Sequence, residues 1–559
     1  MSKPNSLSSV RWIFLLGAIL LASGLPARAH MEPMNGRQMV QQSRHIVVAT
    51  PESAQARWND RHNLIVTDYV LAIEDRLHGD APARVRITIP GGTVDGETHR
   101  TCLSTHLEVG GRYLLFLGDL EQRTFTPVTG ASQGVIREVA GREAEFAGVV
   151  RSMRSWVAEA LAAPAPQGAP RSTAEQRASY PVKAFDPTPA LHLENVESVA
   201  PRGEELPAPS LPLLENVERG LVELAETGGQ DRFQSFVDAY RYEHRANRPI
   251  VFNQLPSNFS VSPHDQYMMS IWNVYAANLF RVRTTPTGTW AWRNGVFDLA
   301  GFPGNAAMQR QFGYTWGATT LGICFSRWTS GPIIEADIAL NPAYSWTTNE
   351  RIGTTQGSAQ SFRQTMLHEL GHAWGLKHPF ESQNVWWDSV MNYSPQAYRF
   401  AHLFADDTTA VRTGFPGTTL RDLLISGYRT RDNTSSNHAT YLAAKPTPST
   451  VRAGNTFSLT NSIKIENTGT TTIVNPKVEV YLVPQRLNWN SSRYLTTLSY
   501  TVTVQPFQTV YLNLGSVRIP TNVPNGTYFV GYYVRDTNDG YQPNNSAWSD
   551  WNGTVRVTR

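Results

Sequence analysis

Residues 368–378 read His-Glu-Leu-Gly-His-Ala-Trp-Gly-Leu-Lys-His, and they place three histidines and one glutamate at fixed spacings. Apolar side chains recur at helical spacing just before this run, and Ser361 with Gln364 forms a capping-box pattern. The sequence therefore predicts an α-helix through the first part of the run. On a helix His368 and His372 lie one turn apart and face the same way, so both imidazoles can reach one metal ion.

The rest of the run adds a base and a third ligand to that pair. Glu369 stands beside the first histidine, where a carboxylate can accept a proton without itself binding the metal. Gly375 can adopt a positive φ at little cost, so the chain can leave the helix sharply and return His378 as a third nitrogen. Three protein ligands leave a fourth position open, as catalytic zinc requires. A solvated helix face is a poor alternative, because these offsets arise by chance with a probability on the order of 10⁻⁴.

The run matches the signature His-Glu-x-x-His-x-x-Gly-x-x-His in every defined position, and in this the chain resembles the metzincin zinc proteases. The resemblance implies one catalytic Zn²⁺ and a Met-turn beneath it, for which Met391 in Ser-Val-Met-Asn-Tyr, residues 389–393, is the candidate. Pro379 and Tyr393 are similar to the serralysin branch, in which the tyrosine ligates zinc or supports the oxyanion. Residues 406–412 resemble the closing helix of matrixins and serralysins. The family also allows structural Ca²⁺, but the serralysin repeat Gly-Gly-x-Gly-x-Asp is missing, so the subfamily stays open.

These residues predict a zinc metalloendopeptidase. Zinc held by His368, His372 and His378 would lower the pKa of a bound water toward about 7, so that Glu369 can complete its deprotonation. Glu369 would then pass the proton to the leaving amine, and Tyr393 is a candidate to assist at the oxyanion. The alternative is a zinc-binding adhesin or inactive pseudo-protease that attaches through its β-modules. The intact Glu369 argues against that alternative, because a non-catalytic site has little need of a base.

A chain of 559 residues is too long for one hydrophobic core, so several units are expected. The pattern predicts a multidomain α+β protein with a β-rich N-terminal module, a metzincin-type α/β catalytic domain with a mixed sheet and an active-site helix, and a C-terminal Ig-like β-sandwich. The expected divisions are a signal peptide at 1–29, the β-rich module at 30–150, a Pro/Ala-rich linker at 151–231, the metzincin-like protease domain at 232–432, a linker at 433–448 and a CARDB-like sandwich at 449–559.

The first residues predict export. Lys3 and Arg11 accompany an apolar run at 12–22, and Ala-Arg-Ala follows at 27–29, which is the layout of a secretory signal peptide. A membrane anchor is the alternative, but the run falls short of the ~20 residues that span a bilayer. The net charge is only +3 and no dense Lys/Arg run occurs, so nucleic acid is not expected as a partner. We expect a secreted or periplasmic protein without stable membrane insertion that acts on proteins or peptides.

The chain has two cysteines, Cys102 and Cys324, which are too few for a disulfide scaffold. They could pair in an oxidising compartment if the distance allows. Alternatively, Cys102 could cap the zinc as a thiolate, although its surroundings differ from the matrixin cysteine-switch sequence. Residues 30–231 are expected to include a pro-region that keeps the enzyme as a zymogen, as latency segments do in many metzincins. A permanent substrate-binding module is the alternative.

A strand at 334–340 is the candidate substrate edge. Ile334, Ala336 and Ile338 alternate with Glu335 and Asp337, as in a strand with one wet face. The strand resembles the clan's edge strand, which binds an extended substrate by β-augmentation. An ordinary core strand is the alternative.

The last module resembles a bacterial adhesion-type sandwich through its turns, such as Asn-Thr-Gly at 467–469. It contains no His, Asp or Glu cluster at metal-ligand spacing. Trp548 and Trp551 are candidates for contact with a surface or a polymer, and packing in the core is their alternative role. The Thr/Ser/Asn-rich residues at 433–448 are expected to keep the module mechanically independent.

Overall fold

The structure is a computed structural model. It describes residues 36–138, 140–141, 143–162, 246–254, 262–283, 291–299, 301–317, 319–347, 360–376, 378, 389–391, 402–415, 419–426, 428–429, 442–443, 446–459, 463–484, 489, 491–512, 514–536, 538–540, 545–549 and 553–559. The expected signal peptide, most of the expected linker at 151–231, and Pro379, Tyr393 and Trp551 lie outside the described residues. Among the helices within these ranges, none is long and apolar enough to cross a membrane.

Of the residues that the structure describes, 42% lie in strands and 20% in helices, so this part of the chain is mostly β. The expected α+β architecture with a distinct metzincin-type α/β catalytic domain is therefore wrong. The prediction assumed that residues 232–432 form a sheet of their own. Instead, the sheet beside the histidine helix takes two of its strands from the N-terminal segment. The strands of the middle segment therefore do not form a complete sheet without the N-terminal segment.

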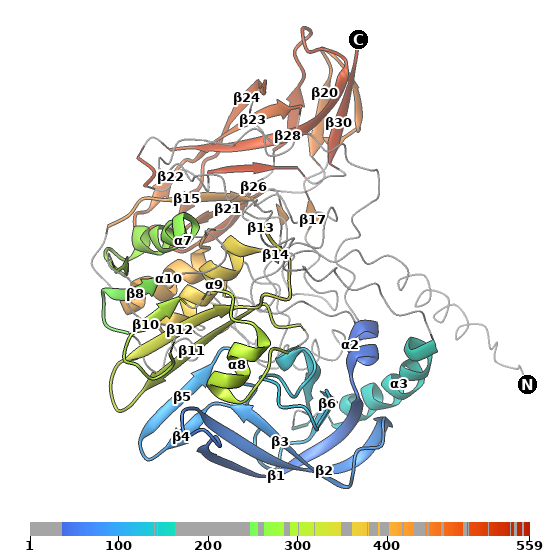
Figure 1. Ribbon diagram of the computed structural model, residues 1–559. Helices are drawn as coiled ribbons and strands as arrows, with labels where there is room; N and C mark the ends of the chain where they lie inside the picture. Colours follow the sequence, from blue (N-terminus) through green and yellow to red (C-terminus); the bar gives the residue numbers. More distant parts are fainter. Residues whose placement is uncertain are drawn as a thin grey trace, which may run out of the picture.

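The N-terminal segment forms a five-stranded antiparallel sheet in the order β3-β2-β1-β6-β7 (Figure 1). Its elements are α2 Gly36–Gln42, β1 His45–Trp58, β2 Ile65–His78, β3 Arg84–Pro90, β6 Tyr113–Leu117, η1 Ala131–Gly134, β7 Val135–Arg137 and α3 Glu143–Ala162. The two helices cover one face of this sheet, where Val40 and Phe146 join Ile46, Val48 and Leu114 in one hydrophobic cluster. Successive side chains of a strand point to opposite sides, so Ile46 and Val48 face the helices, whereas Val47 and Ala49 between and after them belong to a second apolar cluster.

A second sheet carries the site and has seven strands in the order β4-β5-β11-β12-β10-β8-β9. Its strands are β4 Gly92–Val94, β5 Glu97–Thr101, β8 Ile250–Gln254, β9 Phe280–Val282, β10 Phe297–Leu299, β11 Gly322–Trp328 and β12 Glu335–Leu340. Strands β9, β8, β10 and β12 are parallel, whereas β11 is antiparallel to both β12 and β5. The expected substrate edge at 334–340 is wrong, because β12 lies between β11 and β10 and all six of its residues are buried. The strand is an ordinary core strand.

Four described helices accompany this sheet: α7 Ser262–Tyr275, α8 Asn305–Phe312, α9 Phe362–Trp374 and α10 Ala405–Gly414. A short parallel pair, β13 Trp346–Thr347 and β14 Gln360–Ser361, leads into α9. Helix α9 packs on β11, β12 and α7. The indole N–H of Trp272 in α7 donates to the Leu367 carbonyl at 3.0 Å, and its ring meets Trp374 edge-on at 5.9 Å. The histidine helix is therefore buried on more than one side, with both indole rings in the same core.

The N-terminal segment and the middle segment share a hydrophobic core. Leu64 and Phe125 from the first segment lie in one cluster with Phe312 and Phe325 from the second. The rings of Phe312 and Phe325 stack at 4.5 Å, and Phe125 meets both edge-on. Aromatic residues bury large apolar areas, so this cluster contributes strongly to holding the two segments together.

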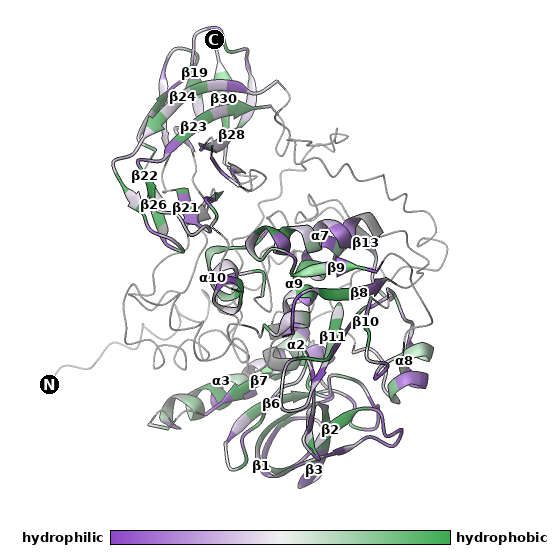
Figure 2. Cartoon of the chain, turned by 90° about the vertical axis from the view of Figure 1, so that its left-hand side faces the viewer, coloured by the Kyte–Doolittle hydropathy of each residue, from purple (hydrophilic) through white to green (hydrophobic). Residues whose placement is uncertain are grey.

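Within the described residues, the C-terminal segment contains strands and no helix. Its elements are β15 Leu423–Ser426, β16 Tyr428–Arg429, β17 Leu442–Ala443, β18 Pro446–Thr447, β19 Thr450–Arg452, β20 Thr456–Leu459, β21 Ile463–Asn467, β22 Ile473–Val474, β23 Lys477–Val483, β24 Arg493–Ser499, β25 Thr503–Val504, β26 Thr509–Leu512, β27 Ser516–Arg518, β28 Gly526–Arg535, β29 Ser546–Trp548 and β30 Thr554–Thr558. A six-stranded sheet, β19-β30-β28-β23-β24 with β29 on β28, shares one apolar core with the smaller sheets β15-β21-β26 and β18-β20-β27. In Figure 2 the strands of this part carry both green and purple stretches.

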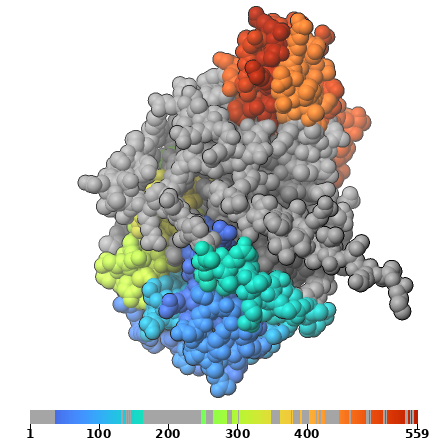
Figure 3. Space-filling model, turned by 90° about the vertical axis from the view of Figure 1, so that its right-hand side faces the viewer, coloured from blue at the N-terminus to red at the C-terminus, as the bar shows by residue number. Residues whose placement is uncertain are grey.

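This C-terminal layer starts earlier than the boundary at 433–448, since β15 pairs with β21 in antiparallel register. The phenol of Tyr275 in α7 donates to Asp422 at 2.5 Å, and the Ala405 N–H at the start of α10 donates to Glu466 at 2.9 Å. All four residues are buried. The expectation of a mechanically independent module therefore fails, although the N-terminal sheet (blue) and the C-terminal strands (red) lie at opposite ends of the molecule in Figure 3.

Candidate metal centre

Local signals position the histidine helix as the sequence predicts. The Ser361 hydroxyl accepts the Gln364 N–H at 3.3 Å, so Ser361 is the N-cap of α9. The helix ends at Gly375, whose φ of 120° is far from helical and whose N–H donates to the carbonyls of Gly371 and His372. Both predictions are confirmed, and the turn at Gly375 sends the chain back toward the helix.

The three histidines meet through their Nε2 atoms. The separations are 2.9 Å between His368 and His372, and 3.1 Å from each of these to His378. All three residues are buried. The Nδ1 atom of His368 lies 2.7 Å from the Val390 carbonyl, and the Nδ1 atom of His372 lies 2.7 Å from the Leu376 carbonyl. A carbonyl can only accept, so each Nδ1 carries the proton and each Nε2 presents a lone pair.

This donor set fits a zinc ion. Lone pairs that converge at about 3 Å repel one another unless a cation lies between them. Tetrahedral zinc with Zn–N bonds of 2.0–2.1 Å needs Nε2 atoms about 3.3 Å apart, which is close to the observed spacing. Magnesium and calcium prefer oxygen ligands, so an all-imidazole set disfavours them. The backbone carbonyls behind two of the rings fix their orientation, as is usual for zinc-binding histidines.

Glu369 lies next to the three imidazoles and is fully buried. Burial raises the pKa of its carboxyl to about 7, and the nearby charge of His368 opposes the rise. A Cβ atom added at Gly322, the first residue of β11, would lie only 2.7 Å from Glu369 Oε1. The absence of a side chain at Gly322 therefore provides the space that the carboxylate occupies.

Met391 packs against the histidine helix at Gly371. A Cβ atom at Gly371, in the helix between the first two histidines, would overlap the Met391 sulfur. The preceding residue, Val390, supplies the carbonyl that orients His368. Met391 therefore packs on the histidine helix between His368 and His372, and its assignment as the Met-turn residue stays a prediction. Tyr393, the other residue expected from this turn, lies outside the described residues.

A buried carboxylate that the sequence analysis did not single out holds this turn. Asp407, in the first turn of α10, accepts the Ser389 hydroxyl at 2.5 Å and the Val390 N–H at 2.8 Å. It also accepts the Phe404 N–H at 3.0 Å, as an acidic residue at the third helical position does in a capping box. The signal available in the sequence was the pair of aspartates that begins this helix.

Cys102 and Cys324 lie side by side but remain free thiols. Cys102 follows β5, and its N–H donates to the Cys324 carbonyl at 3.2 Å. Its sulfur lies 3.5 Å from Glu369 Oε2 and accepts the Cys324 N–H at 3.2 Å. Burial raises the pKa of both thiols well above the usual value. The disulfide alternative is not formed. The sulfur of Cys102, a carboxylate oxygen of Glu369 and a ring nitrogen of His372 all lie within 4.8 Å of one another, so Cys102 lies beside the histidine group, and its role as a zinc cap stays a prediction.

No family model matches this chain, and no curated protein matches it. Among solved structures, a domain of a cell surface protein from Methanosarcina acetivorans is similar at 16% identity and a TM-score of 0.14, over 21% of this chain and 95% of that one. The alkylpurine DNA glycosylase AlkC of Pseudomonas fluorescens, bound to DNA containing an abasic site analog, is similar at 12% identity and a TM-score of 0.13, over 28% of this chain and 34% of that one. Likeness this weak supports no statement about fold or function.

Proposed function

We propose that this chain is a zinc-dependent endopeptidase. The observation that carries the proposal is the convergence of the Nε2 atoms of His368, His372 and His378, all of them buried, beside the buried carboxylate of Glu369. The peptide-bond specificity rests on the resemblance of residues 368–378 to the metzincin signature. Export is part of the same proposal and is supported by the signal-peptide pattern at residues 1–29.

The three histidines, Glu369 and two backbone carbonyls would each have a separate role in hydrolysis. A zinc ion bound by the three histidines would supply the electrophile that activates water and polarises a peptide carbonyl. Glu369 is placed to take a proton from the attacking water and to deliver it to the leaving amine. A pKa raised by burial makes this carboxylate a stronger base than an exposed glutamate, and a nearby dication would moderate that rise. Val390 and Leu376 keep two of the imidazoles in the tautomer that binds metal.

The test measures zinc content and peptide hydrolysis on the same preparations of the full chain. Glu369→Gln should keep one zinc per chain and lose about 10²- to 10⁴-fold in hydrolysis, because the general base is gone and the ligands remain. His378→Ala should lower zinc content as well. Zinc binding with no chelator-sensitive hydrolysis in any form of the chain would instead support the zinc-binding adhesin, and hydrolysis that survives Glu369→Gln would refute the mechanism.

A further inference from the structure

Strand β5 occupies the outer edge of β11, the strand that leads into the site. The register pairs Thr98 with Trp328 and Thr101 with Phe325, in antiparallel order. The opposite edge of β11 is taken by β12, and on this edge β5 and Cys102 cover β11 from Trp328 to Cys324. Strand β11 begins at Gly322, whose Cα faces Glu369. An extended peptide that added to β11 would therefore run along β5's present position toward the base.

The chain continues from β5 into the site itself. Cys102 extends the ladder by one bond to Cys324 and brings its sulfur to 3.5 Å from Glu369 Oε2. The chain then turns away, with the Ser104 N–H donating to the Thr101 carbonyl at 3.0 Å. Residues 97–102 thus run as an extended segment along β11 as far as the Glu369 carboxylate, and the chain then turns away from the site. A substrate strand and this segment would use the same backbone groups of β11, so the two exclude each other.

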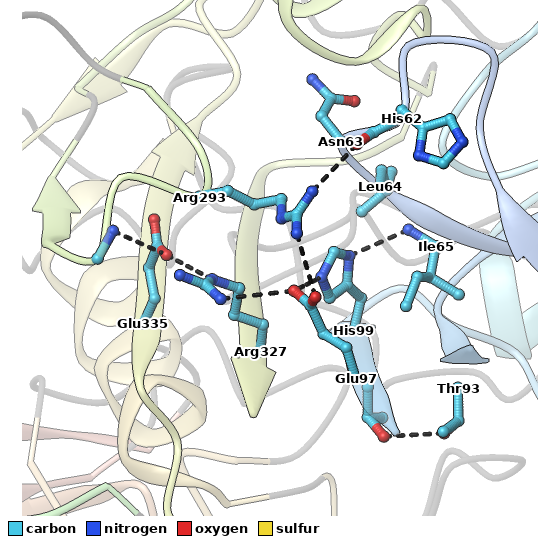
Figure 4. A network of polar contacts seen from close by, with 12 residues as sticks. His62, Asn63, Leu64, Ile65, Thr93, Glu97, His99, Arg293, Arg327 and Glu335 are labelled. Atoms are coloured by element: carbon cyan, nitrogen blue, oxygen red, sulfur yellow. Dashed lines mark hydrogen bonds and ion pairs between the residues drawn. The ribbon is translucent and has the colours of Figure 1, made fainter. Parts of the chain in front are cut away.

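A polar network holds β5 in this place (Figure 4). The Glu97 carboxylate accepts from His99 at 2.8 Å and pairs with Arg293 at 3.1 Å and Arg327 at 3.4 Å. His99 Nδ1 accepts the Ile65 N–H at 3.0 Å, which leaves its Nε2–H to donate to Glu97. Two cations from the middle segment therefore converge on one carboxylate from the N-terminal segment.

We propose that residues 97–102 are a built-in inhibitory strand, which blocks the peptide-binding edge of β11 and covers Glu369 with the sulfur of Cys102. The inference rests on the proposed endopeptidase function. The aromatic cluster around Phe125, Phe312 and Phe325 keeps the N-terminal segment attached, so inhibition depends on the strand and the thiol and not on the whole segment coming free. The full chain is then a latent form, and local displacement of this strand opens the site.

Two substitutions weaken this contact without altering the aromatic cluster. Cys102→Ala removes the sulfur from Glu369. Arg100→Pro removes an N–H that points toward β11, because N–H groups alternate along a strand and the N–H of Cys102 points there. Glu74→Gln is the matched control, since Glu74 pairs with Arg112 on the exposed side of the same segment.

The experiment measures the initial rate on a short quenched-fluorescence peptide, together with zinc content and the thermal midpoint, for each full-length variant. The Arg100→Pro/Cys102→Ala double variant should raise the rate by at least about tenfold at unchanged zinc content, since the rate follows the fraction of chains with an open edge. Glu74→Gln should stay within about twofold. The inference would be wrong if the double variant folds, binds zinc and hydrolyses the peptide at the wild-type rate, provided that Glu369→Gln abolishes this hydrolysis. In that case β5 would be a permanent part of the active enzyme. The absence of hydrolysis in every zinc-loaded form would remove the proposed function and this inference with it.

Discussion

Gly322 shows how a residue without a side chain can define a reactive site. It lies on β11 and Glu369 lies on α9, so no local pattern in the sequence links them. The contact arises only when the sheet and the helix pack together. A reacting carboxylate needs its position held closely, because a displacement near 1 Å can cost about 10²-fold in rate.

Gly322→Ala should therefore reduce catalysis more than it reduces metal binding. The new methyl group would lie 2.7 Å from Glu369 Oε1 and 3.1 Å from Thr365 Cγ2, so the carboxylate must move. We expect the hydrolysis rate to fall by at least about tenfold with zinc content retained. Gly331→Ala is the control, because a Cβ there meets nothing within 4 Å. Equal rates for the two variants would mean that Glu369 tolerates the displacement.

His99 should make the stability of the chain sensitive to acid. Burial lowers the pKa of His99 from 6.5 to about 4, against the opposing effect of Glu97. The folded chain thus binds this proton less readily than the unfolded chain. The contribution of neutral His99 to the free energy of unfolding is therefore fully present above about pH 6.5 and is lost as the pH falls toward about 4. The loss should approach about 3 kcal/mol, measured by urea unfolding across this range. His99→Gln should show a flatter profile, and parallel profiles for the two proteins would contradict the assignment.

At the level of elements, α10 supports the site although it supplies no ligand. Its Asp407 ties the residues before and including Met391 to the start of the helix. The Val390 carbonyl held in this way orients His368, so the helix acts on the metal through one backbone segment. Partners of this kind tune metal affinity even though they do not touch the ion.

Asp407→Ala should weaken zinc binding by about 10- to 100-fold, because the carbonyl behind His368 loses its support. It should also lower the free energy of unfolding by about 2 to 4 kcal/mol, since several buried donors lose their acceptor. Competition with a zinc-sensitive dye and urea unfolding measure the two effects. Asp75→Ala, which breaks an exposed ion pair with Arg154, should change stability by less than about 1 kcal/mol and leave zinc affinity as it was. Unchanged zinc affinity in Asp407→Ala would show that the turn holds itself.

The sequence predicts elements that depend on neighbours along the chain. Ser361 and Gly375 mark the two ends of α9 because caps are local signals, and the histidine spacing follows from the helical repeat. The strand at 334–340 was placed at an edge because periodicity reports burial but not pairing partners. The contact between Cys102 and Glu369 could not be predicted from the sequence either, because the two residues are 267 positions apart. The predicted fold class was wrong for the same reason, because the pairing of β5 with β11 joins segments that are far apart in the sequence.

At the scale of the whole molecule, the C-terminal strands should stabilise the helices beside the site. A chain that stops after residue 440 would lose β21, the partner of β15, and the Glu466 carboxylate that accepts the Ala405 N–H. We expect faster amide hydrogen exchange in α10, where the Ala405 N–H loses its acceptor. The end of α7 should also exchange faster, because Asp422, the partner of Tyr275, loses the Thr468 hydroxyl that donates to it. Tyr275→Phe in the full chain should give a smaller change of the same sign. Exchange rates equal to those of the full chain would restore the view of an independent module.

The pairing of β5 with β11 also bears on the order in which the molecule acquires its shape. Cys102 and Cys324 are 222 positions apart, so the loop that their meeting closes is among the most entropically demanding in the chain. We expect this sheet to close late, after the nearer contacts have formed. The strand that closes it also delivers the thiol to Glu369. A newly made chain would thus reach its finished sheet and its covered carboxylate in one step, which would spare neighbouring unfolded polypeptides during synthesis.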